Sequence, residues 1–332
     1  METARHSNIS IFIPHMGCPH MCSFCNQRTI SKTSVAPSAE EVRETLENAC
    51  GMLPEGKSEI AFFGGSFTAI DREYMISLLD SAKPFVKSGR VSGIRISTRP
   101  DCIDAEILEI LKEYGVTAIE LGAQSMDDTV LEANERGHTA EDVRKASESI
   151  KKSGFELGLQ MMTGLYLSTP EKDYETALEI AALKPDTVRI YPVVILKGTR
   201  LGELFQSGEY KPYPFEIASE LCADLLEMFE EKKIRVIKLG LHSSETVEAD
   251  MLGGFYHQAF REICEGILFR RKIEKELTDG NKFTVYTAQN AVSKASGHKR
   301  SNIEYFGRKG ITVKIKPDKN LSGRNIIVKR EE

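Results

Sequence analysis

Short apolar runs alternate with longer amphipathic stretches through roughly the first two thirds of the chain. The apolar runs are rich in Ile, Val, Leu and Phe, which is typical of buried parallel strands. The stretches between them repeat apolar residues every three or four positions, as helices with one buried face do. We expect strands at 8–14, 59–63, 93–97, 118–121, 156–161 and 187–191. We expect helices at 39–50, 72–86, 105–114, 140–152, 174–183 and 215–232.

This order of elements predicts an α/β fold built on a parallel sheet. Parallel neighbours need right-handed helical crossovers, so the sheet curls as repeats are added. Eight repeats close a barrel, whereas six leave a partial (β/α)6 TIM-like barrel that is open on one side. Ligands of such folds lie at the carboxyl ends of the strands. Those ends are therefore where we look for chemistry.

Three regions follow from the pattern. Residues 1–235 form the partial barrel, and residues 236–278 form a connector that we expect to cover its mouth together with a strand at 235–239. Residues 279–332 form a small basic α/β domain. In that domain we expect strands at 283–286, 311–315 and 325–328, and helices at 288–295 and 302–306.

Charge divides the chain in the same way. Residues 279–332 hold 12 Lys and Arg against 5 Asp and Glu. The whole chain holds 44 and 49, for a net charge of -5, so residues 1–278 hold 44 − 12 = 32 basic and 49 − 5 = 44 acidic residues. A basic appendage on an acidic body favours a polyanionic partner for the appendage.

Composition also indicates a compartment. No apolar run is long enough to cross a bilayer, and the first six residues lack an apolar signal segment. We therefore expect a cytoplasmic protein with no membrane partner. The seven cysteines then favour metal or catalytic use over disulfides. Those at 50, 102, 222 and 264 have no ligand spacing and fit small buried apolar side chains.

The other three cysteines are closely spaced directly after the first expected strand. Cys18, Cys22 and Cys25 form a C-x-x-x-C-x-x-C motif, and thiolates at such spacing can converge on one iron–sulfur cluster. With three ligands for four irons, one iron stays open for chemistry. A zinc site or an incidental group of buried thiols is the alternative.

This motif, with the aromatic residue Phe24 before its last cysteine, resembles the cluster loop of the radical S-adenosylmethionine (radical SAM) superfamily. The resemblance implies that Cys18, Cys22 and Cys25 hold a 4Fe-4S cluster and that Phe24 lies at the cofactor. S-adenosylmethionine (SAM) would bind the open iron, and one electron from an external donor would split it into methionine and a 5′-deoxyadenosyl radical.

The second expected strand ends in Gly64-Gly65-Ser66. Paired glycines let the backbone turn tightly and approach a ligand closely. The turn resembles the one that holds the SAM amino group in this superfamily, which implies that Gly64, Gly65 and Ser66 bind the cofactor. An ordinary strand–helix turn is the alternative.

Polar residues also end the third and fourth expected strands. Ser97 and Arg99 suit a ribose hydroxyl and a carboxylate, because a guanidinium can pair with a carboxylate through two hydrogen bonds. A salt bridge from Arg99 to Asp101 or Glu120 is the alternative. We expect Arg99, Glu120 and Gln124 to act in catalysis, since polar groups at strand ends are more often functional than those on helix faces.

Two histidines have competing interpretations. His138 either contacts a ligand or belongs to a loop whose Thr139 caps the next helix. His242 follows the strand at 235–239, and we expect it to contact substrate or transfer a proton. A histidine with no part in the chemistry is the alternative in both cases.

The motifs GGSFT, ISTRPD, ELGAQSMDD, RGHT, MTGL and IYPVVILKGTRL occur in this order over roughly residues 7–213. Together they resemble the radical SAM branch that contains the catalytic subunit of the Elongator complex and its short bacterial relatives. That branch is associated with modification of wobble uridine in transfer RNA (tRNA) and also uses an acetyltransferase domain. The remaining third of this chain has no helix-opening glycine-rich loop for a pyrophosphate, so acetyl transfer is not carried over.

The basic C-terminal domain has a candidate nucleic-acid site. The tetrapeptide GHKR at 297–300, between two expected helices, loosely resembles the loop with which a KH module clamps a nucleic-acid backbone. Arg300 replaces the second glycine of that loop. We expect Lys299, Arg300, Arg308 and Lys309 to contact RNA phosphates, with a solvated basic helix cap as the alternative.

The leading hypothesis is therefore a radical SAM enzyme that modifies RNA, with tRNA as the expected partner. A radical SAM oxidase or maturase of a small molecule or tetrapyrrole is the second. A non-catalytic RNA-binding protein with a structural cluster is the third, and it belongs to a different class.

Overall fold

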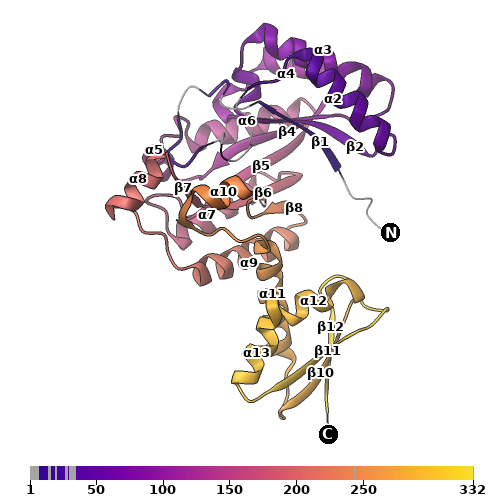
Figure 1. Cartoon of the computed structure of the whole chain (residues 1–332), viewed down its shortest axis with the longest axis vertical. Helices are drawn as coiled ribbons and strands as arrows, with labels where there is room; N and C mark the ends of the chain where they lie inside the picture. Colours follow the sequence, from indigo (N-terminus) through magenta and orange to yellow (C-terminus); the bar gives the residue numbers. More distant parts are fainter. Residues whose placement is uncertain are drawn as a thin grey trace.

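A parallel sheet of seven strands, in the order β1-β2-β3-β4-β5-β6-β8, forms the main body. The structure, a computed structural model, describes residues 7–13, 16–18, 21–26, 29, 35–242 and 244–331. The sheet strands are β1 (Ser7–Ile13), β2 (Ser58–Gly64), β3 (Ile94–Thr98), β4 (Val116–Gln124), β5 (Glu156–Thr163), β6 (Thr187–Pro192) and β8 (Arg235–Leu239). The sheet has β1 at one edge and β8 at the other, so the expected partial barrel is confirmed (Figure 1).

The sheet has one strand more than the six that the sequence predicts. The strand at 235–239 was expected over the mouth, but as β8 it pairs in parallel with β6, for example Val188 with Val236. The strand expected at 8–14 corresponds to β1, and Pro14 lies outside the described residues. The partial barrel therefore continues to residue 239.

Helices cover the outer face of the sheet and start where the sequence supplies a cap. The longer ones between strands are α2 (Ala39–Met52), α3 (Arg72–Lys87), α4 (Ala105–Glu113), α6 (Ala140–Lys152), α7 (Pro170–Ala182) and α9 (Phe215–Glu231). The Ser38 hydroxyl accepts from the Glu41 amide, and Thr139 accepts from Asp142 in the same way. Such caps satisfy amide donors that the first helical turn leaves without a partner.

The two faces of the sheet differ in chemistry. Under the helices the strands contribute apolar side chains such as Ile60, Ile96 and Leu159, which are 0–1% exposed. The alternate residues face the concave side, as successive strand residues must, and several of these are charged. Arg95 and Glu120, for example, are 2% and 1% exposed.

Short elements lie beyond the carboxyl ends of the strands. They are α5 (Asp128–Ala133), β7 (Val194–Leu196), α8 (Arg200–Ser207), α10 (Glu245–Asp250) and β9 (Met251–Gly254), with β7 and β9 paired antiparallel. Thr29, just after the cysteine loop, donates to Asp250 at 2.8 Å and accepts from Thr246 at 2.6 Å. These bonds join the connector to the end of the cysteine loop.

The helix α11 (Phe260–Glu276) joins the barrel to the C-terminal unit (Figure 1). Its first half contributes Phe260 and Ile267 to the barrel core, while Phe269 and Ile273 belong to small cores of the C-terminal unit. Arg271 also pairs with Glu220 of α9 at 2.5 Å. The two regions are thus joined through shared packing along one helix.

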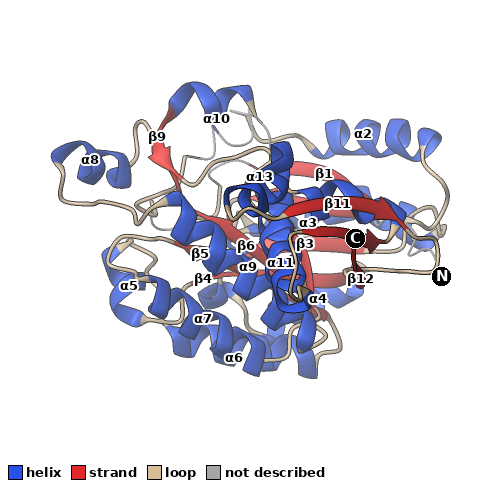
Figure 2. Cartoon of the chain, turned by 90° about the horizontal axis from the view of Figure 1, so that it is seen from below, coloured by secondary structure: helices blue, strands red, loops and turns tan. Residues whose placement is uncertain are grey.

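The C-terminal unit is a three-stranded sheet with helices on one side, as expected. Its elements are β10 (Lys282–Thr287), α12 (Val292–Ser296), α13 (Ser301–Arg308), β11 (Thr312–Pro317) and β12 (Ile326–Arg330), with the strands in the order β11-β10-β12. The helix expected at 288–295 is shorter, because its first turn is a 3-10 helix, Gln289–Ala291. Figure 2 shows the unit from below. Across the described parts of the chain, every helix is too short or too polar to span a membrane.

Candidate functional site

The three closely spaced cysteines follow β1 at the carboxyl edge of the sheet. The Cys25 amide donates to the Cys22 carbonyl at 3.0 Å, which folds the end of the loop into a turn. Cys18 is exposed, while Cys22 and Cys25 are half-buried. Phe24 between them packs against the barrel core and anchors the loop.

The segment after β4 holds this loop from the other side. Asn134 accepts from Ser23 twice, at its backbone carbonyl at 3.1 Å and at its side-chain oxygen at 2.8 Å. Arg136 is 6% exposed, and it donates to the Cys22 sulfur at 3.0 Å and to the Gly122 carbonyl at 2.6 Å. A buried cation thus lies directly on one of the three sulfurs.

The surroundings of Cys18 favour its protonated thiol. Partial burial of the Cys18 thiol, followed by the nearby Cys22, raises the pKa of Cys18. A bound metal overcomes such a shift because a coordinating thiol is deprotonated outright. Among the described residues no three His, Cys, Asp or Glu side chains are grouped tightly enough to hold a metal ion.

The glycine turn after β2 packs against the start of the cysteine loop. Gly65 donates to the Ile13 carbonyl at 2.9 Å and Ser66 donates to the Met16 carbonyl at 3.2 Å. A side chain at Gly65 would place its Cβ 2.0 Å from the Met16 oxygen, and one at Gly64 would place it 2.5 Å from the Ile13 oxygen. Gly64 also has a φ of +116°, which disfavours any other residue. The two loops therefore depend on both glycines for their close approach.

Hydroxyl groups connect this turn to the end of β3. The Ser66 hydroxyl lies 2.8 Å from that of Thr98 and accepts from the Arg99 amide at 3.2 Å. The Arg99 side chain is 4% exposed and makes a bidentate pair with Asp101, with both bonds at 2.9 Å. Of the two salt bridges considered for Arg99, the structure forms the one to Asp101.

The expected catalytic residue Glu120 belongs to a buried ion-pair network on the concave face. Its carboxylate accepts from Arg189 at 2.6 and 2.9 Å and lies 3.4 Å from Arg95. Gln160 donates to Glu120 at 2.8 Å and to Ser97 at 3.3 Å. The structure thus links Ser97 to Glu120 through one amide, and the two arginines neutralise the carboxylate.

Four buried polar atoms around the strand ends have no hydrogen-bond partner among the described residues. They are Arg99 Nη1, Arg136 Nε, Gln124 Oε1 and His138 Nδ1. Buried polar groups in native proteins almost always have a hydrogen-bond partner. A group of exceptions therefore indicates that a ligand or water binds there. Two are cationic donors and two are acceptors, which matches a ligand that carries a carboxylate and an amino group.

His138 is buried rather than part of an exposed loop. Its Nε2 lies 3.2 Å from the Ala123 carbonyl, and it is 5% exposed. Burial, with Arg136 and Arg99 nearby, lowers the pKa of His138 to about 4, so the ring is neutral at physiological pH. Thr139 next to it caps α6, as one of the two sequence interpretations of this segment expects.

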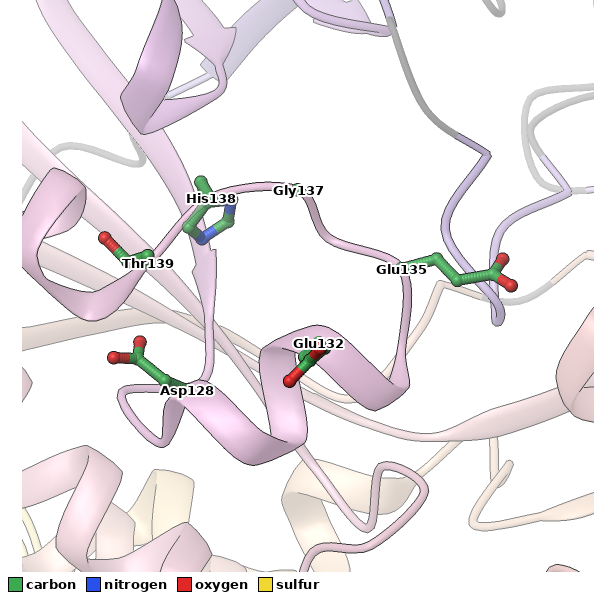
Figure 3. Close-up of a pocket in the computed structure, with 6 residues that line it drawn as sticks. All are labelled: Asp128, Glu132, Glu135, Gly137, His138 and Thr139. Atoms are coloured by element: carbon green, nitrogen blue, oxygen red, sulfur yellow. The ribbon is translucent and has the colours of Figure 1, made fainter.

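A cavity of about 430 Å³ lies on the other side of the same loop and is lined by Asp128, Glu132, Glu135, Gly137, His138 and Thr139 (Figure 3). The loop that carries Gly137 arches over α5, with Asp128 and Glu132 below it. Three carboxylates make this cavity acidic, which disfavours a phosphate. The thiols are not among its lining residues, so we do not assign the cofactor to it.

Other predicted residues lie apart from this group. His242 is exposed in the segment after β8.

Arg136 and Asn134 were missed by the sequence analysis, although the RGHT motif that contains Arg136 was noted at a strand end. The signal was weak because the contact from Arg136 to Cys22 joins residues 114 positions apart.

The four basic residues expected to contact RNA differ in their surroundings. Lys299 and Arg300 are exposed on the turn between α12 and α13, with φ of +50° and +67°. Lys309, by contrast, pairs with Glu274 at 2.7 Å, and Arg308 lies 3.8 Å from Glu304. The turn therefore offers its cations more openly than the end of α13 does.

Comparison with known families gives two adjoining matches. The family model described as the radical SAM superfamily matches residues 12–181. A model described as the radical SAM C-terminal domain matches residues 185–269. The first alone covers half of the chain and contains the three cysteines, the glycine turn and the segment with Arg136.

Similar proteins carry related names. A tRNA uridine(34) acetyltransferase of Methanocaldococcus jannaschii is 36% identical over 191 residues, which are 51% of this chain and 35% of that protein. Elongator complex protein 3 of Homo sapiens is 33% identical over 193 residues, 52% of this chain and 35% of that protein. An uncharacterized protein of M. jannaschii is 32% identical over 65% of both chains. The chain thus spans about a third of the length of the first two.

Solved structures share the fold. Elp3 of Methanocaldococcus infernus, lacking its N-terminus, superposes with a TM-score of 0.57 at 23% identity, covering 74% of this chain and 61% of that one. SuiB of Streptococcus suis, bound to S-adenosylmethionine, gives 0.52 at 14% identity over 73% and 52%. At such identities the likeness establishes the fold alone.

Proposed function

This chain belongs to the radical SAM superfamily, and we propose that it uses the chemistry of that family to modify tRNA. The observation that carries the proposal is that Arg136 and Asn134 both hydrogen-bond to the three-cysteine loop. A buried guanidinium 3.0 Å from the Cys22 sulfur holds that sulfur in position as a ligand. An ordinary buried cysteine has no need of such a partner.

The residues present fit a 4Fe-4S cluster and SAM. Cys18, Cys22 and Cys25 supply the three thiolates that the cluster requires. When bound and reduced, the pair supplies a 5′-deoxyadenosyl radical. In this proposal Arg99 Nη1, buried and without a partner among the described residues, donates to the SAM carboxylate, while Gln124 Oε1 accepts from its amino group.

The surrounding residues position these groups. Gly64, Gly65 and Ser66 bring the second loop against the first and offer backbone carbonyls to the SAM amino group. Ser97, at the end of β3, is placed to meet the ribose. Phe24 holds the loop between two of its cysteines, and its ring shields the site from water.

Glu120 and His242 complete the proposed set. Because Arg189 and Arg95 already neutralise Glu120, we assign it the task of orienting Gln160 and Ser97 rather than moving a proton. His242 lies on the mouth-covering connector, where an exposed imidazole meets a large substrate before it reaches the sheet.

The RNA part of the proposal rests on the relatives and on charge. Proteins named as tRNA uridine(34) acetyltransferases share the barrel sequence. The C-terminal unit exposes Lys299 and Arg300 on a tight turn, and the ring of His298 on that turn lies 4.8 Å from His257 of the connector. A phosphate bound at the turn would therefore lie next to the mouth cover. A tRNA substrate and an external one-electron donor imply a cytoplasmic enzyme.

The test is mass spectrometry of tRNA nucleosides. Unmodified tRNA transcripts and total cellular tRNA are incubated without oxygen with reconstituted protein, SAM and dithionite, and then digested. We expect a new nucleoside mass that depends on SAM and is missing with Cys22→Ala, whereas Cys50→Ala on α2 retains it. Formation of 5′-deoxyadenosine without any tRNA change would favour a small-molecule or tetrapyrrole substrate. Salt-sensitive tRNA binding with neither product would favour a non-catalytic binder.

A further inference from the structure

The sheet of the C-terminal unit has one face without a helix of that unit. Val285 of β10, Val313 of β11 and Val328 of β12 point to the other side, where they pack with Ile273 and Phe306 of the helices. Figure 1 shows α11, α12 and α13 on that one side of the three strands. The alternate residues must therefore point away from the helices.

These alternate residues form a surface that we call the open face. At its centre Tyr286 is half-buried and registers with Lys316 on β11 and Ile327 on β12. One step along, Thr284 registers with Lys314 and Lys329 on the same two strands. Residues in register share a face, so an aromatic ring lies among three lysines and an exposed isoleucine.

The chemistry of the open face differs from that of an ordinary solvated sheet. Ile327 is 43% exposed, although an apolar side chain gains nothing from water. Lys329 Nζ lies 5.4 Å from the centre of the Tyr286 ring, and Lys314 is 3.0 Å from Glu331. Three exposed lysines against that carboxylate leave the face cationic around a half-buried aromatic ring.

We propose that the open face binds a single-stranded segment of RNA, with one base stacked on Tyr286 and the adjoining phosphates on Lys316 and Lys329. Aromatic side chains on open sheets accept unpaired bases because every base has a π-face, and lysines beside them track the backbone. Ile327 then packs against the edge of the stacked base. This proposal rests on the proposed function and adds the place and strandedness of the RNA.

Other partners fit the open face less well. A double-stranded helix presents its bases stacked inside, so the ring of Tyr286 would gain nothing from it. An acidic protein segment would neutralise the lysines but would not use the exposed aromatic and aliphatic surface. The turn with Lys299 and Arg300 lies between the helices, on the other side of the sheet, so it acts separately.

The experiment measures binding of the full reconstituted chain to a fluorescein-labelled twelve-nucleotide uridine RNA by anisotropy. Tyr286→Ala is expected to weaken binding by about tenfold, the factor that corresponds to ~1.4 kcal/mol and to loss of one stacked base. Tyr286→Phe keeps the ring and is expected to bind within about twofold of wild type, since stacking on a phenyl ring is retained. The same order is expected for an unmodified tRNA transcript.

Surface variants provide a second readout that does not depend on the fold of the core. The double variant Lys316→Gln and Lys329→Gln should make the plot of log affinity against log salt shallower by about 1.4, because two phosphate contacts are lost. The matched control, Lys145→Gln with Lys152→Gln on α6, should leave the plot unchanged.

Three outcomes would overturn the inference. If Tyr286→Ala binds RNA as tightly as wild type, with an unchanged circular dichroism spectrum and with tRNA still modified, the open face is rejected. The proposed function then stays in place. A wild-type chain that binds neither RNA at low salt would reject both the open face and the tRNA substrate. If the control variant, Lys145→Gln with Lys152→Gln, made the salt dependence as shallow as Lys316→Gln with Lys329→Gln does, a defined site would be rejected.

Discussion

The concave face of the barrel and the open face of the C-terminal unit are both polar sides of a sheet. They differ in that charged side chains are buried and paired on the first and exposed on the second. In the barrel, Arg95 contacts Glu59 at 2.8 Å and Glu156 at 2.9 Å while remaining 2% exposed. On the open face, Lys316 and Lys329 are exposed to solvent. Buried charge must be neutralised locally, whereas exposed charge is available to a partner.

This difference separates two tasks in one chain. The paired charges of the barrel fix Ser97 and Gln160 in place next to the strand ends, where reactive chemistry needs exact orientation. The exposed cations of the C-terminal unit provide attraction over a longer range, which suits capture of a polyanion. The predictions below test whether the two regions can be damaged independently.

The largest expected effect comes from the cysteine loop. Cys22→Ala removes the sulfur that Arg136 contacts, so the reconstituted protein should lose its visible iron–sulfur absorption. Its RNA affinity should stay within about twofold, because the proposed phosphate contacts lie elsewhere. Cys50→Ala, a half-buried cysteine on α2, is the matched control and should keep both. Retention of full absorption by Cys22→Ala would remove the ligand assignment.

The next effect concerns the ion-pair network. Glu120→Gln leaves Arg189 and Arg95 without their shared carboxylate and should lower the free energy of unfolding by about 3–5 kcal/mol, as loss of one partner of a buried pair does. Glu179→Gln breaks the exposed pair with Arg144 and should cost less than about 1 kcal/mol. Urea unfolding of both variants measures the difference, and equal losses would show that burial does not govern the network.

A third effect depends on pH. The pKa of His138 falls from 6.5 in the unfolded chain to about 4 in the fold, so between these values the unfolded state binds a proton that the native state does not. Stability supplied by the neutral ring is full above pH 6.5 and is lost as the pH falls towards 4, by up to about 3 kcal/mol. The His138→Gln variant should not lose this stability as the pH falls from 6.5 towards 4.

The comparison between wild type and His138→Gln isolates that residue. Burial raises the pKa of Asp173 to about 6, which makes stability fall as the pH rises through the overlapping window. Asp173 is present in both proteins and cancels in the difference between their unfolding free energies. Parallel stability curves from pH 7 to 4 would contradict the buried, neutral assignment of His138.

The smallest expected effect is on the turn of the C-terminal unit. Lys299→Gln with Arg300→Gln should make the salt dependence of tRNA binding shallower by about 1.4, because two phosphate contacts are lost. Lys145→Gln with Lys152→Gln on α6 is the control, since both side chains are 72% exposed on the barrel. An unchanged salt slope would assign the turn to a solvated helix cap.

The sequence predicted the frame of the barrel because each strand is a short apolar run between amphipathic stretches. It placed β8 wrongly over the mouth, since Arg235 and Lys238 make that strand look half-exposed. Lys238 in fact lies where burial lowers its pKa, near Arg189 of the neighbouring strand. Apolar content alone does not assign a charged strand that faces a polar concave surface to the sheet.

The site was predictable where its residues are neighbours in sequence and not where they are distant. The three cysteines and the glycine turn are local motifs. The hydrogen bond from Arg136 to Cys22 and the pairing of Glu120 with Arg189 depend on how β4 and its loop lie against other strands. Pairing of Lys309 with Glu274 likewise needs the position of α13 on α11, so charge alone does not show which cations are paired.

One measurement tests the central claim most directly. Reconstituted protein with a full complement of iron and sulfide is mixed with SAM and dithionite without oxygen, and 5′-deoxyadenosine is quantified by chromatography. The account predicts 5′-deoxyadenosine from wild type and none from Cys22→Ala. A wild-type sample that carries a complete cluster and produces no 5′-deoxyadenosine would contradict it.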